Sequence, residues 1–179
     1  MALISTVSPE NAEGSIKEAY EMFMKNIGMI PKPMEMMSAS PALFDIQLQR
    51  IRYFSKHPTL GFPLLAHIRY LVAHNLNYAF CMDFNRHVLK KQGISDDDIR
   101  KMEADPSESM LEEKDSAMLA FVVKAVKDPA SVTADDVKKL KDMGWKDRDM
   151  VDALSQGVSM IDHSIMMQVF QIDQNCMVA

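Results

Sequence analysis

Apolar residues recur along almost the whole chain with the period of about 3.6 residues that places them on one face of an α-helix. No segment of strand length alternates apolar and polar residues with a period of two. The pattern therefore predicts an all-α protein folded as a compact helical bundle. The predicted helices cover residues 13–26, 41–56, 63–75, 79–92, 96–104, 110–127, 134–143 and 147–173.

Prolines separate the early helices, because a residue without a backbone N–H is tolerated best in a loop or at a helix start. The prolines at such positions are Pro31, Pro33, Pro41, Pro58 and Pro63. The stretch "GMIPKP" at 28–33 is too short and too apolar for a domain linker, so we predict a structured connector. The stretch "ADPSES" at 104–109 is the best loop candidate.

Two segments of the chain repeat one pattern 51 residues apart. "LKKQGISDDDI" at 89–99 and "LKDMGWKDRDM" at 140–150 share the order L-K-x-x-G-apolar-x-D-x-D-apolar. In each, we expect a helix to stop at a glycine, Gly93 or Gly144, and a new helix to open with acidic residues that its N-terminus favours. Ser95 and Asp98 have the spacing of a capping box. The sequence thus predicts a pseudo-repeated α-hairpin.

The size of the chain fits one compact domain, since 179 residues with 47% hydrophobic content can bury a substantial core. We expect a single domain over 1–179, with an N-terminal part at 1–60, a core at 61–104 and a second half at 110–179.

Composition narrows the range of partners. Twenty basic against twenty-five acidic residues give a net charge of −5, which argues against nucleic acid and anionic membranes as partners. No apolar run approaches the roughly 20 residues of a membrane span, and "MALISTVSPENAEG" lacks the features of a signal peptide. We therefore expect a cytoplasmic protein, in which the only two cysteines, Cys81 and Cys176, rest as thiols.

Cys81 belongs to a segment with a recognisable family pattern. "PLLAHIRYLVAHNLNYAFCMDFNRHVLKKQG" at 63–93 resembles the core of the carboxymuconolactone decarboxylase family, in particular its alkyl hydroperoxidase D-like branch. "GMIPKPMEMMSASPALF" at 28–44 resembles an N-terminal segment of the longer members, and 112–170 resembles their second half. The resemblance covers most of the chain and implies a helical bundle of the alkyl hydroperoxidase D-like type.

The catalytic motif of that family is incomplete in this chain. The family carries a glutamate on one helix and C-x-x-C at the start of the next, with a histidine four residues after the second cysteine. The matching positions here hold Ala66, Tyr78, Cys81 and Asn85. The resemblance implies a peroxidase-type antioxidant, an oxidoreductase with peroxiredoxin activity, whose redox motif has lost one cysteine, the glutamate and the histidine. Cys81, Tyr78 and Asn85 are its candidate catalytic positions.

Cys81 can keep only part of the chemistry that the resemblance implies. A helix N-terminus favours a thiolate, but Tyr78 cannot act as a resolving thiol. Cys176 supplies a second thiol only if it reaches Cys81 in the same or a neighbouring subunit. The alternative is a buried cysteine that packs as a small hydrophobic side chain.

A second hypothesis is an acid–base lyase or isomerase that acts on a small carboxylated substrate. Such an enzyme needs a cationic pocket, and Arg69 or Arg86 with His74 or His163 are the candidate substrate-binding residues. His67 lies seven residues before His74, a rise of about 10.5 Å, whereas one metal ion usually takes helical ligands three or four residues apart. We therefore predict no metal site and no cofactor.

A third hypothesis is a non-catalytic, ligand-binding oligomeric module that retains the fold without the site. Members of the family assemble as homo-oligomers, and the seventeen methionines of this chain supply adaptable apolar faces for such an interface. The expected partners are other copies of this chain and a small-molecule substrate.

Overall fold

The computed structural model describes residues 2–172 and contains, within them, α-helices and short 3₁₀ helices but no strand. The prediction of an all-α protein is confirmed. The α-helices are α1 (Gly14–Ile27), α2 (Lys32–Met37), α3 (Pro41–Ser55), α4 (Phe62–Asn75), α5 (Ala79–Lys91), α6 (Asp96–Ala104), α7 (Glu113–Lys127), α8 (Ala134–Asp142) and α9 (Asp147–Val169). The 3₁₀ helices are η1 (Pro9–Asn11), η2 (Pro106–Glu108) and η3 (Pro129–Ser131).

The chain forms two compact units, of which the first comprises residues 2–57 and 165–172. Its core is built on α1 and α3, where the rings of Tyr20 and Phe44 meet edge to face at 6.1 Å. The Tyr20 hydroxyl donates to the carbonyl of Val7, and the Val7 N–H donates to the Ser38 hydroxyl. These bonds fix the N-terminal segment against the first two helices of the unit.

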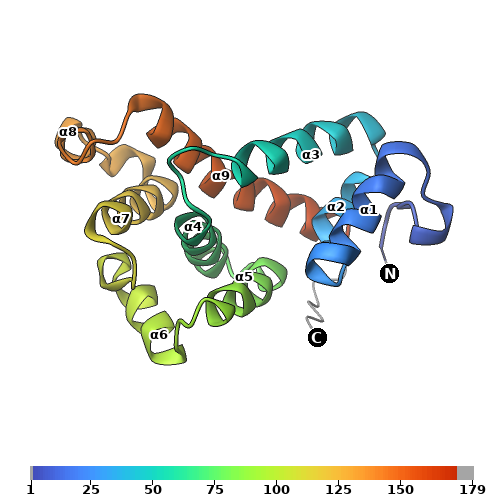
Figure 1. Ribbon diagram of the computed structural model, residues 1–179, viewed down its shortest axis with the longest axis horizontal. Helices are drawn as coiled ribbons and strands as arrows, with labels where there is room; N and C mark the ends of the chain where they lie inside the picture. The colour runs from blue at the N-terminus through green and yellow to red at the C-terminus, as the bar shows by residue number, and fades with distance from the viewer. Residues whose placement is uncertain (1, 173–179) are drawn as a thin grey trace. The chain divides into compact units, whose positions relative to one another are not determined.

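The second unit comprises residues 58–164 and is organised around α4. Nine of the 14 residues of α4 are buried, so this helix is apolar on nearly every side, as a central helix must be. Figure 1 shows α4 enclosed by α5, α6 and α7. A glycine of α9, Gly157, lies against valines of α4 and α7, so α9 also packs closely on this core.

The pseudo-repeated hairpin is present at the level of the backbone. Gly93 and Gly144 both have a φ of +86°, a left-handed conformation that favours glycine. The residue after each glycine, Ile94 or Trp145, donates its N–H to the carbonyl of a leucine in the preceding helical turn, at 3.2 and 3.0 Å. Both helices therefore end in a Schellman motif.

The side chains of the two hairpins repeat as well. Lys90 pairs with Asp96 at 2.8 Å, and the equivalent Lys141 pairs with Asp147 at 2.7 Å. In each copy the aspartate two residues further on accepts the N–H of the residue before the helix, at 3.3 Å in the first hairpin and 3.0 Å in the second. The predicted capping box at the start of α6 is confirmed.

Three predicted boundaries are wrong by more than one residue, each for a local reason. The connector at 28–33 already contains the start of α2, because Pro33 occupies its first turn, where a missing N–H is harmless. α7 begins at Glu113 rather than 110, after Glu112 in an extended conformation. α9 ends at Val169 rather than 173, because Gln171 adopts a φ of +51°.

Among residues 2–172, no helix is both long and apolar enough to cross a lipid bilayer. The expectation of a single domain over 1–179 stays a prediction.

Candidate functional site

A tight turn between α4 and α5 positions the segment that carries Cys81. Asn77 has a φ of +52°, a conformation that asparagine tolerates better than most residues. The N–H of the next residue, Tyr78, donates to the carbonyl of Ala73 at 2.9 Å and so closes α4. Tyr78 then serves as the N-cap residue of α5. The two helices therefore reverse direction within a few residues, and Cys81 lies in the first turn of the second helix.

Cys81 and Tyr78, three residues before it, are both buried. Cys81 is 6% exposed and Tyr78 is fully buried. Burial, followed by the proximity of Cys81, raises the pKa of Tyr78 far above its ordinary value. Tyr78 therefore stays a neutral phenol at physiological pH, with its hydroxyl close to the thiol.

Arg69 and Asn85 form the polar part of the same site. The Nε of Arg69 donates to Oδ1 of Asn85 at 3.0 Å, and Nδ2 of Asn85 donates to the Cys81 carbonyl at 2.9 Å. Asn85 is 1% exposed, and both the oxygen and the nitrogen of its side-chain amide are hydrogen-bonded. The guanidinium also lies over the ring of Phe62, 5.8 Å from its centre. Asn85 thus holds a cation against the start of α5.

Arg69 interacts electrostatically with Cys81. Burial lowers the pKa of Arg69 to about 10, and its electrostatic interaction with Cys81 is the opposing influence. Arg69 therefore remains a cation at neutral pH. A cation beside a thiol favours the thiolate, which is the nucleophilic form. We call Arg69, Tyr78, Cys81 and Asn85 the Cys81 cluster.

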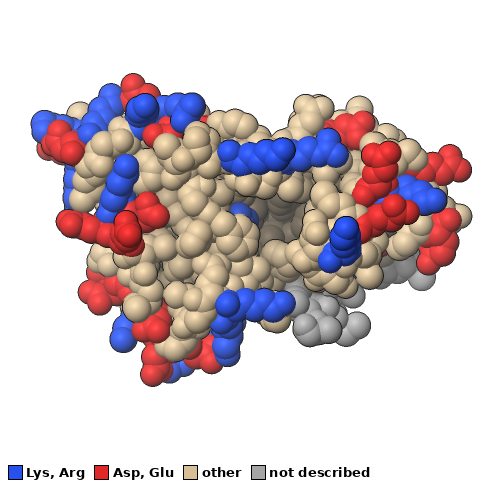
Figure 2. Space-filling view, in the orientation of Figure 1, with Lys and Arg blue, Asp and Glu red and all other residues tan. Residues whose placement is uncertain are grey.

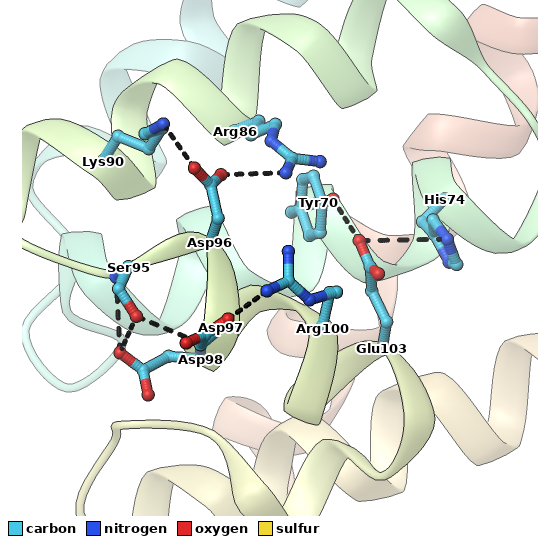
Figure 3. Close-up of polar contacts among 10 residues, drawn as sticks. All are labelled: Tyr70, His74, Arg86, Lys90, Ser95, Asp96, Asp97, Asp98, Arg100 and Glu103. Carbon is cyan, nitrogen blue, oxygen red and sulfur yellow. Dashed lines mark hydrogen bonds and ion pairs between the residues drawn. The ribbon is translucent and has the colours of Figure 1, made fainter.

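A second polar cluster joins α4, α5 and α6, as Figure 3 shows. The Tyr70 hydroxyl donates to Oε1 of Glu103 at 2.5 Å, and Nε2 of His74 lies 3.9 Å from the same oxygen. The Arg86 guanidinium lies beside Tyr70 and pairs with Asp96 at 2.8 Å (Figure 3). We call these five residues the Tyr70 cluster.

Burial and hydrogen bonds shift the pKa values of two members of the Tyr70 cluster, Tyr70 and Asp96. Burial, and then the hydrogen bond to Glu103, raises the pKa of Tyr70. Hydrogen bonds from Lys90 and Arg86 lower the pKa of Asp96 to about 2. At neutral pH the cluster therefore contains a phenol that donates to a carboxylate, with Arg86 as its cation.

The candidate residues from the sequence are thus divided between clusters. Cys81, Tyr78, Asn85 and Arg69 lie together, whereas His74 and Arg86 belong to the Tyr70 cluster. His163 lies buried on α9. Cys176, the candidate resolving thiol, lies outside the described residues. Within residues 2–172, no group of three or more histidine, cysteine or acidic side chains is placed to hold a metal ion.

Sequence analysis missed the roles of Tyr70, Asp96 and Glu103. The sequence could have linked Tyr70 to His74, because the two lie four residues apart and therefore share one face of α4. Asp96 carries a signal too, since it is the aspartate of the repeated hairpin pattern. The approach of Glu103 depends on how α6 packs, which the local pattern does not specify.

Burial of His67 has a separate consequence. Its Nδ1 lies 2.8 Å from the carbonyl of Pro63, which assigns the proton to that nitrogen. Its Nε2 is buried without a hydrogen-bond partner in the described part of the chain. Burial is the main cause that lowers the pKa of His67, so the folded protein holds this side chain neutral.

Comparison with known proteins gives no match to any family model and none to a curated protein. Solved structures do match. One is the crystal structure of an alkylhydroperoxidase AhpD core, an uncharacterized peroxidase-related protein from Ralstonia eutropha JMP134, with a TM-score of 0.81 and 14% identity. The match covers 97% of this chain and 92% of that one.

A second match is an uncharacterized peroxidase-related protein from Silicibacter sp. TM1040. Its TM-score is 0.77 at 14% identity, over 97% of this chain and 93% of that one. At this identity the similarity concerns the fold, which is the one that the family resemblance of the sequence implied. The chain therefore has the alkyl hydroperoxidase D-like helical fold.

Proposed function

We propose that this protein is a single-cysteine thiol peroxidase of the alkyl hydroperoxidase D-like type, in which Cys81 reduces a small hydroperoxide. The observation that carries the proposal is the Arg69 guanidinium, held against the start of α5 by its 3.0 Å bond to Asn85. A buried cysteine that serves only as packing needs no such cation, whose partial burial costs free energy. Beside a reactive cysteine, the same cation stabilises the thiolate that attacks the hydroperoxide.

The reaction is a two-electron oxidation of sulfur. The Cys81 thiolate attacks the terminal oxygen of the hydroperoxide, an S–O bond forms and the O–O bond breaks. Cys81 becomes a sulfenic acid, and the alkoxide that leaves takes up a proton and departs as an alcohol, or as water when the substrate is hydrogen peroxide. The positive charge of Arg69, which interacts electrostatically with Cys81, stabilises the negative charge that develops on the leaving oxygen.

Regeneration requires a thiol from elsewhere. Tyr78 replaces the first cysteine of the family motif, so no resolving thiol lies three residues from Cys81. We propose that a low-molecular-weight thiol condenses with the sulfenic acid, releasing water, and that a second thiol then reduces the mixed disulfide. This cycle requires a reducing compartment, which is consistent with a cytoplasmic location.

The low exposure of Cys81, 6%, favours small substrates. Hydrogen peroxide and short alkyl hydroperoxides are therefore the substrates that we propose, rather than long-chain lipid hydroperoxides.

The test is the oxidation of Cys81 by hydrogen peroxide and tert-butyl hydroperoxide, followed by dimedone trapping and mass spectrometry. We expect a sulfenic acid at Cys81 in the wild type and none in Cys81→Ser. Arg69→Gln should slow the oxidation by about tenfold or more, the loss of roughly 1.4 kcal/mol of charge stabilisation. Arg100→Gln, at an exposed position of α6, is the matched control and should leave the rate unchanged.

The Cys176→Ser variant decides where the resolving thiol comes from. If Cys176 contributes, the wild type accumulates a disulfide that this variant lacks. A Cys81 that stays reduced under excess peroxide would refute the peroxidase proposal and leave a non-catalytic module as the better interpretation.

A second candidate function is favoured by the Tyr70 cluster. The 2.5 Å bond from Tyr70 to Glu103 places a proton donor, a carboxylate and the imidazole of His74 together, with Arg86 as a cation for a carboxylated substrate. This arrangement suits an acid–base lyase or isomerase. Turnover of a carboxylated substrate that is lost in Glu103→Gln and kept in Cys81→Ser would identify this function instead.

Self-association is part of the proposal. On α9, the apolar residues Val151, Leu154, Val158 and Ile161 follow the three-and-four spacing of a coiled-coil seam. Val151 is 67% exposed and Val158 is 46% exposed. We propose that this face pairs with the same face of a second copy. Val158→Glu should then convert an oligomer into monomers in sedimentation velocity, and an unchanged sedimentation coefficient would exclude this face as the interface.

A further inference from the structure

The hairpin of α7 and α8 contains a cavity of about 560 Å³ that the proposed functions do not use. This volume lies within the range of roughly 300–1000 Å³ that small-molecule sites occupy. Its lining residues come from 107–143 and include no member of the Cys81 cluster or the Tyr70 cluster.

Small side chains create the cavity. Ala117 and Ala120 lie on the face of α7 that lines it, with Leu140 on α8 and Met143 at the C-cap of α8. Alanine leaves space between the two helices where a larger side chain would fill it. Phe121 supplies an aromatic wall and is only partly buried, so part of the apolar lining stays accessible.

One cation at the cavity is not neutralised. Lys124 pairs with Asp136 at 2.7 Å, so these two lining charges cancel. Lys139 also lines the cavity and forms no ion pair with any residue that the structure describes. Acidic and basic side chains are intermixed over α8 in Figure 2, so Lys139 acts as a local charge and not as part of a broad basic surface.

Other lining residues of the cavity disfavour an anion. The Ser107 hydroxyl donates to Asp105 at 2.8 Å. The Ser116 hydroxyl lies 2.8 Å from the Ser109 hydroxyl and 3.3 Å from the carbonyl oxygen of Leu111, so its proton is shared between these two acceptors or donated to one of them. The hydroxyl protons of Ser107 and Ser116 are therefore used within the protein, and Glu113 adds a negative charge to the lining. A carboxylate in the cavity is therefore repelled by Glu113 and attracted by Lys139.

We propose that this cavity binds an amphipathic monocarboxylate, with its apolar chain or ring between Ala117, Ala120 and Phe121 and its carboxylate at Lys139. The ligand is a second, non-redox ligand of the protein, because no residue of the cavity lies in the Cys81 cluster.

The chain contains a built-in reporter for this binding. Trp145 is the only tryptophan, and it follows two residues after Met143 of the cavity wall. Its indole N–H donates to the carbonyl of Lys114 at 3.0 Å, and the Lys114 ammonium lies 4.3 Å from the ring centre. A ligand that moves the first turn of α7 or the end of α8 therefore changes the surroundings of the indole.

The experiment titrates the full chain with sodium octanoate, 1-octanol and octyltrimethylammonium, each below its micellar concentration. Trp145 fluorescence and isothermal titration calorimetry measure the binding independently. We expect saturable binding of octanoate, at least fivefold weaker binding of octanol, and weaker binding still of the cationic compound.

Three variants locate the site. Lys139→Gln should weaken octanoate binding about fivefold or more while leaving octanol binding unchanged. Lys138→Gln, one position away and 70% exposed in its pair with Asp142, is the matched control and should bind as the wild type does. Ala120→Phe should abolish binding with its helical circular dichroism preserved. Equal affinity for octanoate and octanol, an unaffected Lys139→Gln, or no saturable heat or fluorescence change would overturn the proposal.

Discussion

Gly157 offers a sharp test of how the second unit is packed. A Cβ atom added at this position of α9 would lie 2.7 Å from Cγ1 of Val122 on α7, 3.3 Å from Val126 and 3.5 Å from Val72 on α4. Ordinary contact begins at 3.4 Å, so the closest pair must separate by 3.4 − 2.7 = 0.7 Å. Val122 is fully buried and cannot move into solvent. Gly157→Ala must therefore push two packed helices apart.

The expected cost follows from two opposing effects. Overpacking a core by one methyl group costs about 1–3 kcal/mol, whereas alanine gains up to about 1 kcal/mol over glycine inside a helix. We expect Gly157→Ala to lower the free energy of unfolding by about 1–2 kcal/mol. In a chain of this size, each kcal/mol shifts Tm by about 2–4 °C, so Tm should fall by about 2–8 °C.

A double-mutant cycle in thermal and urea unfolding separates the clash from other effects. Val122→Ala alone should destabilise through the cavity that it leaves. In that background the new Cβ of Gly157→Ala occupies the vacated space, so the second substitution should cost nothing or stabilise. A wild-type Tm in Gly157→Ala, or costs that simply add in the double variant, would refute the packing argument.

Two further outcomes follow from the buried polar groups of the second unit. Asn85→Leu leaves the Nε of Arg69 without its acceptor and should cost about 2 kcal/mol in urea unfolding, whereas Asn75→Leu, at an exposed position of α4, should cost less than about 0.5 kcal/mol. His67 has a lowered pKa in the folded state, so the unfolded chain binds the additional proton, and stability should fall as the pH drops below the ordinary histidine value of about 6.5. In His67→Gln the decline of the free energy of unfolding between about pH 7.5 and 5.5 should be shallower than in the wild type, although the contact with Pro63 is lost. Equal slopes in the two proteins would show that His67 does not contribute to the pH dependence.

Much of the helical arrangement could be predicted because it depends on local signals. The repeated hairpin is an example, since Gly93 and Gly144 stop their helices through backbone geometry alone. α2 was missed because its six residues begin among prolines, which usually mark loops. The end of α9 was missed because Gln171 takes a left-handed conformation that its residue type does not signal.

Some contacts within the site could be predicted from the sequence and others could not. Arg69 lies eight residues before Asn77, and Asn85 lies eight residues after it. In an antiparallel helical hairpin, residues equidistant from the turn face each other, so this pair follows once Asn77 is recognised as the turn. The bond from Tyr70 to Glu103 spans 33 residues and another helix, and its formation depends on tertiary packing.

The residues that match the family motif bear on the chemistry that we propose for the site. The family resemblance implies a glutamate that serves the thiols as general base or proton relay, and a histidine four residues after the second cysteine. Here Ala66 is fully buried, and Asn85 uses both groups of its amide to hold Arg69 and the Cys81 carbonyl. An amide and a guanidinium cannot relay a proton at neutral pH, but they can hold a fixed positive charge beside sulfur. Under the proposed function, Arg69 therefore stabilises the Cys81 thiolate electrostatically where the family pattern implies proton transfer, which suits one thiolate that reacts alone better than a pair of thiols that must be deprotonated in turn.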